Sequence, residues 1–181
     1  MLGMAPGAPA PHSCTMDGST RPTPARAMSG AGPADGDPAF RDAAKILARA
    51  EADESAANQA RELHRAKAMT PMEPDLRIAP VLDPDERLYA VRRHAVLDRR
   101  QALVGPNAQS GIAGDLYLTS RRLVLLGRRP LAFDLDGIEE VLLSGERLLL
   151  VMRDGEGASL SVTQPRLLRV EIAAARQSAR R

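Results

Sequence analysis

The sequence is poor in cysteine and in aromatic residues: of 181 residues, one is cysteine (Cys14), none is tryptophan, and two are tyrosine and two phenylalanine. A single cysteine cannot form an intramolecular disulfide, so a reducing cytoplasm is the simplest compartment. No stretch approaches the ~18 consecutive apolar residues of a transmembrane helix. We therefore expect a soluble, cytoplasmic chain, and any membrane contact is expected to be peripheral, at the inner membrane face.

Groups suited to catalysis or metal binding are also scarce. His12 and His64 fall outside the region expected to fold as a domain, and His94 is alone in an expected strand. No cluster of His, Cys, Asp or Glu has the spacing of a metal site, and the turn at 155–157 lacks the helix and lysine of a phosphate-binding loop. The sequence thus predicts a non-enzymatic protein with no catalytic residue, metal, cofactor or small-molecule substrate.

Neither sign of charge dominates. The formal net charge is +2, and cations and anions are interspersed. Phosphate-dominated binding needs clustered cations, so no nucleic-acid partner is expected. Arginine outnumbers lysine 23 to 2, which we attribute to GC-rich coding in a bacterial, actinobacterial source rather than to phosphate recognition.

What is present divides the chain into four parts. Residues 1–37 are rich in Ala, Pro and Gly without periodicity, which predicts a disordered tail. Residues 38–69 contain no Gly and no Pro beyond the first position, which predicts a long Ala-rich helix. Prolines interrupt residues 70–82 and predict an extended linker. Residues 83–181 hold almost all of the Leu and Val and are expected to form the folded domain.

The long helix carries few large apolar residues, and they lack the sustained heptad spacing of a coiled coil. We expect either a solvated arm that docks weakly on the domain or an interaction helix for a partner. Its large apolar residues are Phe40, Ile46, Leu47, Leu63 and Met69.

The second half of the chain alternates as short strands followed by one helix. Residues 86–100 are expected to form one long strand, with Arg93 interrupting its apolar face. That face is expected to carry Tyr89, Val91, Ala95 and Leu97. The other expected strands are 115–119, 123–126, 131–135, 138–143, 147–152 and 158–162. Thr163 or Gln164 is expected to cap a final amphipathic helix that has Pro165 in its first turn.

A motif in these strands resembles that of the GRAM domain, a member of the pleckstrin-homology-like (PH-like) superfold, and the resemblance covers about residues 83–179. The matching positions are Gly114, Leu116-Tyr117, Leu118-Thr119, Arg122-Leu123 and the segment Leu135 to Val141. The resemblance implies a mainly β fold, a PH-like seven-stranded, partly open barrel capped by one C-terminal helix. Here it would be preceded by the long N-terminal helix and the tail.

The resemblance also implies a binding module. Such domains engage phosphoinositides, other anionic lipids or protein surfaces, and bacterial relatives are similar to oligomerising scaffolds. The common lipid-binding signature places a lysine in the first strand and basic residues on the second. This sequence departs from that signature, since the strand at 115–119 carries no cation.

Two pairs of arginines form a candidate ligand site for an anionic head group. In a meander, the end of the first strand and the turn between the third and fourth strands fall at the same open end of the barrel. These segments carry Arg99, Arg100, Arg128 and Arg129. Guanidinium groups bind such anions well, but paired arginines in turns are also common as solvated surface groups.

Two strands, 123–126 and 148–152, are apolar on both faces, so their outer side should be covered. The candidate interface residues there are Val124, Leu126, Leu149 and Val151. The expected cover is the helix at 38–69, a second copy of the domain, or another protein. The leading hypothesis is therefore a non-enzymatic interaction module that contacts a protein partner or itself as a scaffold. The alternative is a peripheral domain that binds anionic lipid.

Overall fold

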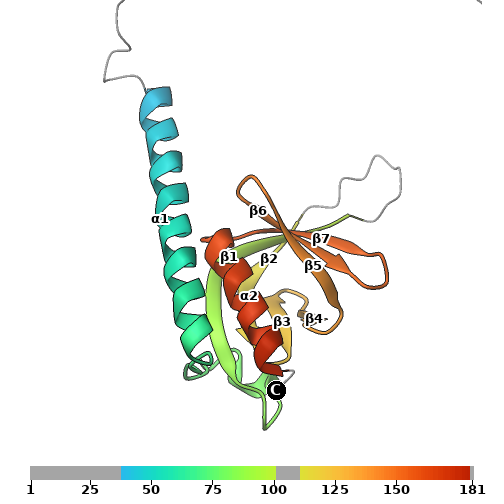
Figure 1. The fold of residues 1–181 in the computed structure, drawn as a ribbon. Coiled ribbons are helices and arrows are strands. Elements are labelled where there is room, and N and C mark those ends of the chain that lie inside the picture. Colours follow the sequence, from blue (N-terminus) through green and yellow to red (C-terminus); the bar gives the residue numbers. More distant parts are fainter. Residues whose placement is uncertain (1–37, 101–110, 180–181) are drawn as a thin grey trace, which may run out of the picture. The chain divides into compact units, whose positions relative to one another are not determined.

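The computed structural model describes residues 38–100 and 111–179, with only the backbone at Arg99 and Arg100. The predicted disordered tail at 1–37 lies outside the described residues. The elements in chain order (Figure 1) are α1 (Pro38–Ala66), the 3-10 turn η1 (Ala79–Val81), β1 (Leu88–Arg100), β2 (Ile112–Thr119), β3 (Arg122–Gly127), β4 (Leu131–Asp134), β5 (Ile138–Ser144), β6 (Arg147–Met152), β7 (Gly157–Ser161) and α2 (Pro165–Ala179). Neither helix is long and apolar enough to cross a lipid bilayer.

The seven strands form one antiparallel sheet in the order β4-β3-β2-β1-β7-β6-β5. β1 lies at the centre because its 13 residues pair first with β2 and then, at the end of the strand, with β7. The described edge strands β4 and β5 do not pair with each other, so the barrel is only partly closed. α2 packs against β1, β5 and β6. The expected PH-like architecture, with its N-terminal helix, is confirmed.

The inner side of the sheet and α2 share one hydrophobic core. Leu116 and Leu118 of β2 point into it, as period-two alternation requires. α2 contributes Leu168, Ile172 and Ala175, whose spacing of four and three places them on one helical face. The sheet thus has an apolar inner side that α2 covers.

Two glycines of the motif allow β2 and β3 to approach closely. Gly114 pairs with Gly127 across the two strands. A Cβ added to Gly114 would lie 2.6 Å from the carbonyl oxygen of Leu126, and one added to Gly127 would clash with the carbonyl oxygen of Ala113. Any side chain at either position would push the strands apart.

β1 does not alternate along its whole length, which corrects the face expected for it. The pairing with β2 shifts between Leu88 and Ala90 and again between Arg92 and Ala95, and His94 has a φ of 57°. Such bulges add a residue to one strand and exchange its two faces. Val91 therefore packs on the outer side, whereas Tyr89, Ala95 and Leu97 pack on the inner core as expected.

The outer side of β1, β2 and β3 is covered by the segment at 70–87, which includes the extended linker expected at 70–82. Ile78, just before η1, is fully buried at the centre of a second apolar cluster. Its other buried members are Leu88, Tyr117, Val124 and Leu126. A backbone bridge between Met72 and Leu88 attaches the start of the segment to the sheet. We call the buried Ile78 side chain the plug.

The motif residues Thr119 and Arg122 close the turn between β2 and β3 around a buried carboxylate. The Thr119 hydroxyl accepts from the Arg122 amide at 2.9 Å and donates to Glu86 at 2.6 Å. The Arg122 guanidinium donates to both oxygens of Glu86, at 3.0 and 2.7 Å. Burial would raise the pKa of Glu86, but these hydrogen bonds outweigh it and hold the pKa below its ordinary value. Glu86 therefore stays charged although its side chain is buried.

The plug is open to a direct test of stability. We expect Ile78→Ala to lower the free energy of unfolding by about 2–5 kcal/mol, because it leaves a cavity over the outer face of the sheet. Leu76→Ala is the matched control, since Leu76 is two residues away and 94% exposed. Urea denaturation followed by circular dichroism measures both, and equal effects of the two substitutions would contradict the assignment of Ile78 as the plug.

Candidate functional site

The backbone register brings the segments of the predicted anion site to one end of the sheet. Leu97 near the end of β1 pairs with Ile112, and Gly114 pairs with Gly127 at the end of β3. Arg128 and Arg129 follow β3 and are exposed. The side chains of the other two predicted residues, Arg99 and Arg100, lie outside the described residues, so the four-arginine cluster stays a prediction.

Two of the four predicted interface residues are not at the surface. Val124 and Leu126 are 2% and 9% exposed, because Ile78 and the segment around it cover them. This corrects the expected cover: neither the helix at 38–69 nor a partner is needed there. Leu149 and Val151 of β6 are half-buried, and Leu149 pairs with Leu142 of β5, which is 36% exposed. A small apolar surface therefore remains on the outer side of β5 and β6.

A polar cluster holds residues 70–87, the segment that carries the plug, against the sheet. Arg93 of β1 donates to Asp75 at 2.8 Å and to Asp115 of β2 at 2.7 Å. The Tyr117 hydroxyl donates to Asp75 at 3.1 Å, and Asp75 also accepts from the amide of Ile78 at 3.0 Å. One carboxylate thus ties the turn that carries the plug to two strands. Sequence reasoning missed this cluster because Arg93 looked only like an interruption of an apolar face.

The carboxyl groups of this cluster are held in their charged form. Desolvation would raise the pKa of Asp115, but the hydrogen bonds from Arg93 and from the His94 amide lower it below its ordinary value. The pKa of Asp75 is lowered in the same way, by the Ile78 amide and Arg93 acting against desolvation. Pairing with Asp115 and Asp75 in turn raises the pKa of Arg93. The cluster therefore keeps both carboxylates charged, and its ion pairs attach residues 70–87 to the sheet.

A second buried ion pair joins β1 to α2. Arg92 donates to Glu171 at 2.7 Å, and the two side chains are 10% and 14% exposed. Burial raises the pKa of Glu171, against the opposing effect of Arg92.

Within the described ranges, no group of three or more His, Cys, Asp or Glu side chains could hold a metal ion. The expectation of a non-enzymatic chain stays a prediction.

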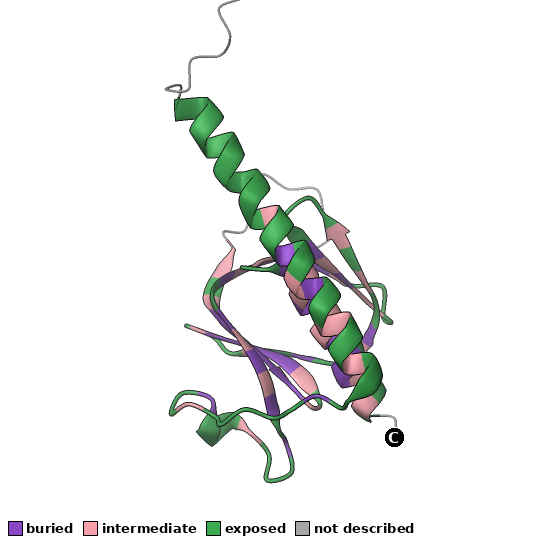
Figure 2. Ribbon diagram, turned by 60° about the vertical axis from the view of Figure 1, so that its left-hand side comes forward, coloured by how far each residue is buried: buried purple, intermediate pink, exposed green. Residues whose placement is uncertain are grey.

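Only the second half of α1 packs on the domain. From residue 38 to residue 49 every side chain is exposed, whereas Asp53 and Ala57 are buried (Figure 2). Phe40, Ile46 and Leu47 are 52%, 57% and 61% exposed. We call residues 38–49 the arm. Large apolar side chains on an element without tertiary cover mark the arm as the candidate interaction surface.

Asp53 joins the two helices by capping α2. Its carboxylate accepts from the backbone amides of Arg166 at 2.8 Å and Leu167 at 3.0 Å. The expected caps, Thr163 and Gln164, are exposed, and Gln164 has a φ of 54°. A carboxylate serves better than either side chain because it also complements the positive end of the helix dipole. No local pattern predicts this cap, since the capping residue belongs to an element more than 100 residues earlier.

We expect Asp53→Ala to destabilise the protein by about 0.5–2 kcal/mol, the range for loss of a helix cap, because two amides of α2 lose their acceptor. Asp42→Ala is the matched control, because Asp42 is exposed on the same helix and its partner among the described residues is Lys45, in a surface pair. Thermal unfolding reports stability, and hydrogen exchange should show faster exchange in both α1 and α2. Faster exchange in α2 alone would show that the contact caps that helix without holding α1.

Comparisons with known proteins return similarity only among solved structures. No protein-family model matches the chain, and no curated protein is similar in sequence. The C-terminal domain of an unknown protein from Leishmania infantum is 13% identical with a TM-score of 0.38, over 56% of this chain and 89% of that one. The pleckstrin homology domain of USP37 is 19% identical with a TM-score of 0.36, over 49% and 96%.

A structure of Vav1 inhibited by an allosteric inhibitor is 13% identical with a TM-score of 0.39, over 78% of this chain and 37% of that one. Similarities at this level do not bear on function. The fold assignment follows from the strand order and from the helix that packs across the open barrel.

Proposed function

We propose that this chain is a non-enzymatic interaction module of the PH-like class, of GRAM type, in a bacterial cytoplasm. In this proposal it binds protein through the arm of α1 and self-associates as a scaffold. The supporting observation is the exposure of Phe40, Ile46 and Leu47, each more than half accessible to solvent.

The arm residues form a packing face rather than a scatter of apolar side chains. At 100° per residue, Phe40 and Leu47 lie about 20° apart around the helix, and Ala43 and Ile46 extend the stripe to about 120°. One edge of the stripe, at Ile46, coincides with the face that carries Asp53 and Ala57, which packs on α2 further along. From Ile46 the arm continues this helix-packing face beyond the start of α2, where the described residues supply no second helix.

A hollow at the base of the arm adds apolar surface to this face. Its apolar lining includes Ile46 of the arm, Val162, which precedes α2, and Pro165, the first residue of α2. Its volume is about 640 Å³. A helix placed along the arm would reach this hollow with its side chains. The arm of a second copy has the small and large side chains, Ala43, Ala44 and Leu47, that close helix packing requires.

Self-association is tested by size-exclusion chromatography with light scattering over a range of concentrations. We expect a concentration-dependent dimer or larger species that the double substitution Phe40→Ser and Leu47→Ser abolishes, because it removes the apolar stripe without touching the domain. Leu63→Ser is the matched control, since Leu63 is on the same helix and 55% exposed. A strict monomer at the highest concentration, or an equal loss in the control, would contradict self-association through the arm.

A second candidate function is binding to an anionic membrane surface. The observation in its favour is the backbone register, which brings the end of β1 and the end of β3 to one end of the sheet. The finer question of whether the side chains of Arg99 and Arg100 join Arg128 and Arg129 belongs to this proposal.

Co-sedimentation with phosphatidylcholine vesicles, with and without phosphatidylserine, tests the lipid proposal. We expect binding only to the anionic vesicles, weakened by salt because exposed charges are screened. Replacement of Arg99, Arg100, Arg128 and Arg129 by Ala should remove it. The control replaces Arg41, Arg49, Arg87 and Arg121 instead, which changes the net charge equally. Equal binding by the two fourfold variants would eliminate the proposed site.

A further inference from the structure

A groove lies between the second halves of α1 and α2, which Figures 1 and 2 show side by side. The helices run parallel, because Asp53 meets the start of α2 while His64 and Gln177, near the two C-terminal ends, line the same groove. Its volume is about 370 Å³. That volume is in the range of small-molecule binding sites.

Small side chains keep the groove open. Ala173 and Ala174 line it on the α2 side. Ala173 is exposed and Ala174 is buried, so together they form part of its floor. A larger side chain at Ala173 would fill the space between the helices without changing any charge.

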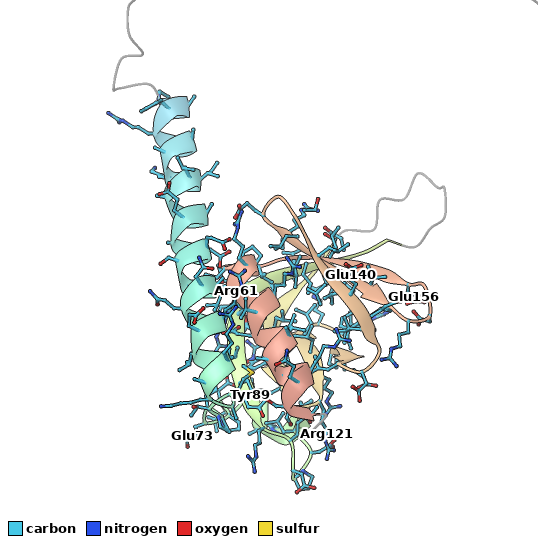
Figure 3. All side chains as sticks on the ribbon, in the orientation of Figure 1. Arg61, Glu73, Tyr89, Arg121, Glu140 and Glu156 are labelled. Atoms are coloured by element: carbon cyan, nitrogen blue, oxygen red, sulfur yellow. The ribbon has the colours of Figure 1, made fainter. Side chains whose placement is uncertain are left out.

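The charged side chains that line the groove are cationic, and Gln177 adds a neutral polar group. Arg61, His64 and Arg65 come from α1 and Arg169 comes from α2, and no carboxylate lines the groove. Figure 3 shows Arg61 on the side of α1 that faces α2. Arg61 pairs with Glu54 at 3.2 Å and Arg65 with Glu62 at 2.7 Å. These carboxylates lie on α1, so they leave the α2 side of the groove without a negative charge.

Arg169 has no ion-pair partner within residues 38–100 and 111–179, the part of the chain that the structure describes. It lies in the second turn of α2, far from the last carbonyls of the helix, so stabilisation of a helix C-terminus does not account for it. A free guanidinium that faces a groove shared with two other arginines is suited to bind an oxyanion.

His64 supplies a second, independent observation. Its Nδ1 is shielded from solvent and has no hydrogen-bond partner among the described residues. Buried polar atoms without a partner are rare in proteins, and strain, a functional role, or an ordered water or ion can account for them. His64 lines the groove on the same side as Arg61 and Arg65.

We propose that the groove between α1 and α2 binds a phosphate monoester. Arg169 and Arg61 hold the phosphoryl oxygens through charge-assisted hydrogen bonds, for which the planar guanidinium is well shaped. The organic part of the ligand lies against Val170 and Ala173. The molecule is bound and not converted, so this site does not depend on an enzymatic function.

Binding at this site would fasten α1 to α2. The ligand contacts both helices, and a ligand that binds only the docked arrangement stabilises it by mass action. The groove is separate from the exposed arm, so this proposal and the proposed self-association can fail independently.

Titration of the full chain with glycerol 3-phosphate, followed by amide NMR shifts, tests the proposal. A residue-level readout is needed because the chain has other exposed arginines. We expect saturable shifts at 61–65 and 169–177, and slower hydrogen exchange in the second half of α1. Glycerol is the matched probe without the phosphoryl group and should leave these amides unshifted.

Two variants locate the site. Arg169→Glu should weaken binding at least about tenfold, because it replaces a charge-assisted hydrogen bond with repulsion, whereas Arg41→Glu, the same charge change on the exposed arm, should not. Ala173→Leu should weaken binding by filling the groove, whereas Ala48→Leu on the arm should not. Arg169 and Ala173 are exposed, so both variants are expected to fold. If either variant fails to fold, the titration of the wild-type chain still tests whether the groove binds the phosphate.

Phosphatidic acid vesicles carry the same phosphate monoester on a lipid and separate the two sources. Shifts with glycerol 3-phosphate assign a soluble ligand. The lipid is assigned if glycerol 3-phosphate causes no shifts but phosphatidic acid vesicles remove the NMR signals of the groove amides. The Arg169→Glu variant should then keep those signals in the presence of the same vesicles. The proposal is overturned if neither probe affects the groove amides, or if Arg169→Glu and Arg41→Glu lose binding equally.

Discussion

The central strands of this sheet are apolar on both sides, and such a sheet is stable only when both sides are removed from water. The inner side is covered by the core that the sheet shares with α2, and the outer side of β1, β2 and β3 is covered by the plug. Full burial of one large aliphatic side chain contributes roughly 1.5–3 kcal/mol, so these two coverings outweigh any single polar contact in the molecule. As a result, the segment at 70–87 is part of the folded domain, and the large apolar side chains that stay exposed include those of the arm and Leu142 of β5.

Charged side chains determine the positions of residues 70–87 and of the two helices relative to the sheet. Asp75 orients the turn that carries the plug, Glu86 closes the turn between β2 and β3, and Asp53 joins the two helices. Each carboxylate receives donors from segments distant in sequence. Removing one partner leaves a buried group unpaired, which costs more than the lost hydrogen bond itself. The arrangement is therefore specific as well as stable.

The local part of this architecture is visible in the sequence, and the long-range part is not. The strands from β2 to β7 and α2 follow from alternation, turn residues and an amphipathic stripe, each encoded within about ten residues. The bulge at His94 cannot be read from one strand, because it exists only relative to the register of β2. For the same reason, a sequence pattern does not show that residues 70–87 cover Val124 and Leu126. A proline-rich stretch has the composition of a linker. Its structural role follows from contacts of Ile78 with strands that are distant in the sequence.

Asp53 also sets the direction in which the arm presents its side chains. Its two oxygens bind amides at fixed positions on α2, so they fix the rotation of α1 about its own axis. The helix is continuous from Pro38 to Ala66, so that rotation is transmitted to Phe40 and Leu47. One residue inserted between Leu47 and Asp53 would leave the domain and the cap intact, yet it would turn the arm's apolar stripe by about 100°. The helical phase between cap and arm is thus a geometric parameter of the molecule, set by the number of residues that separate them.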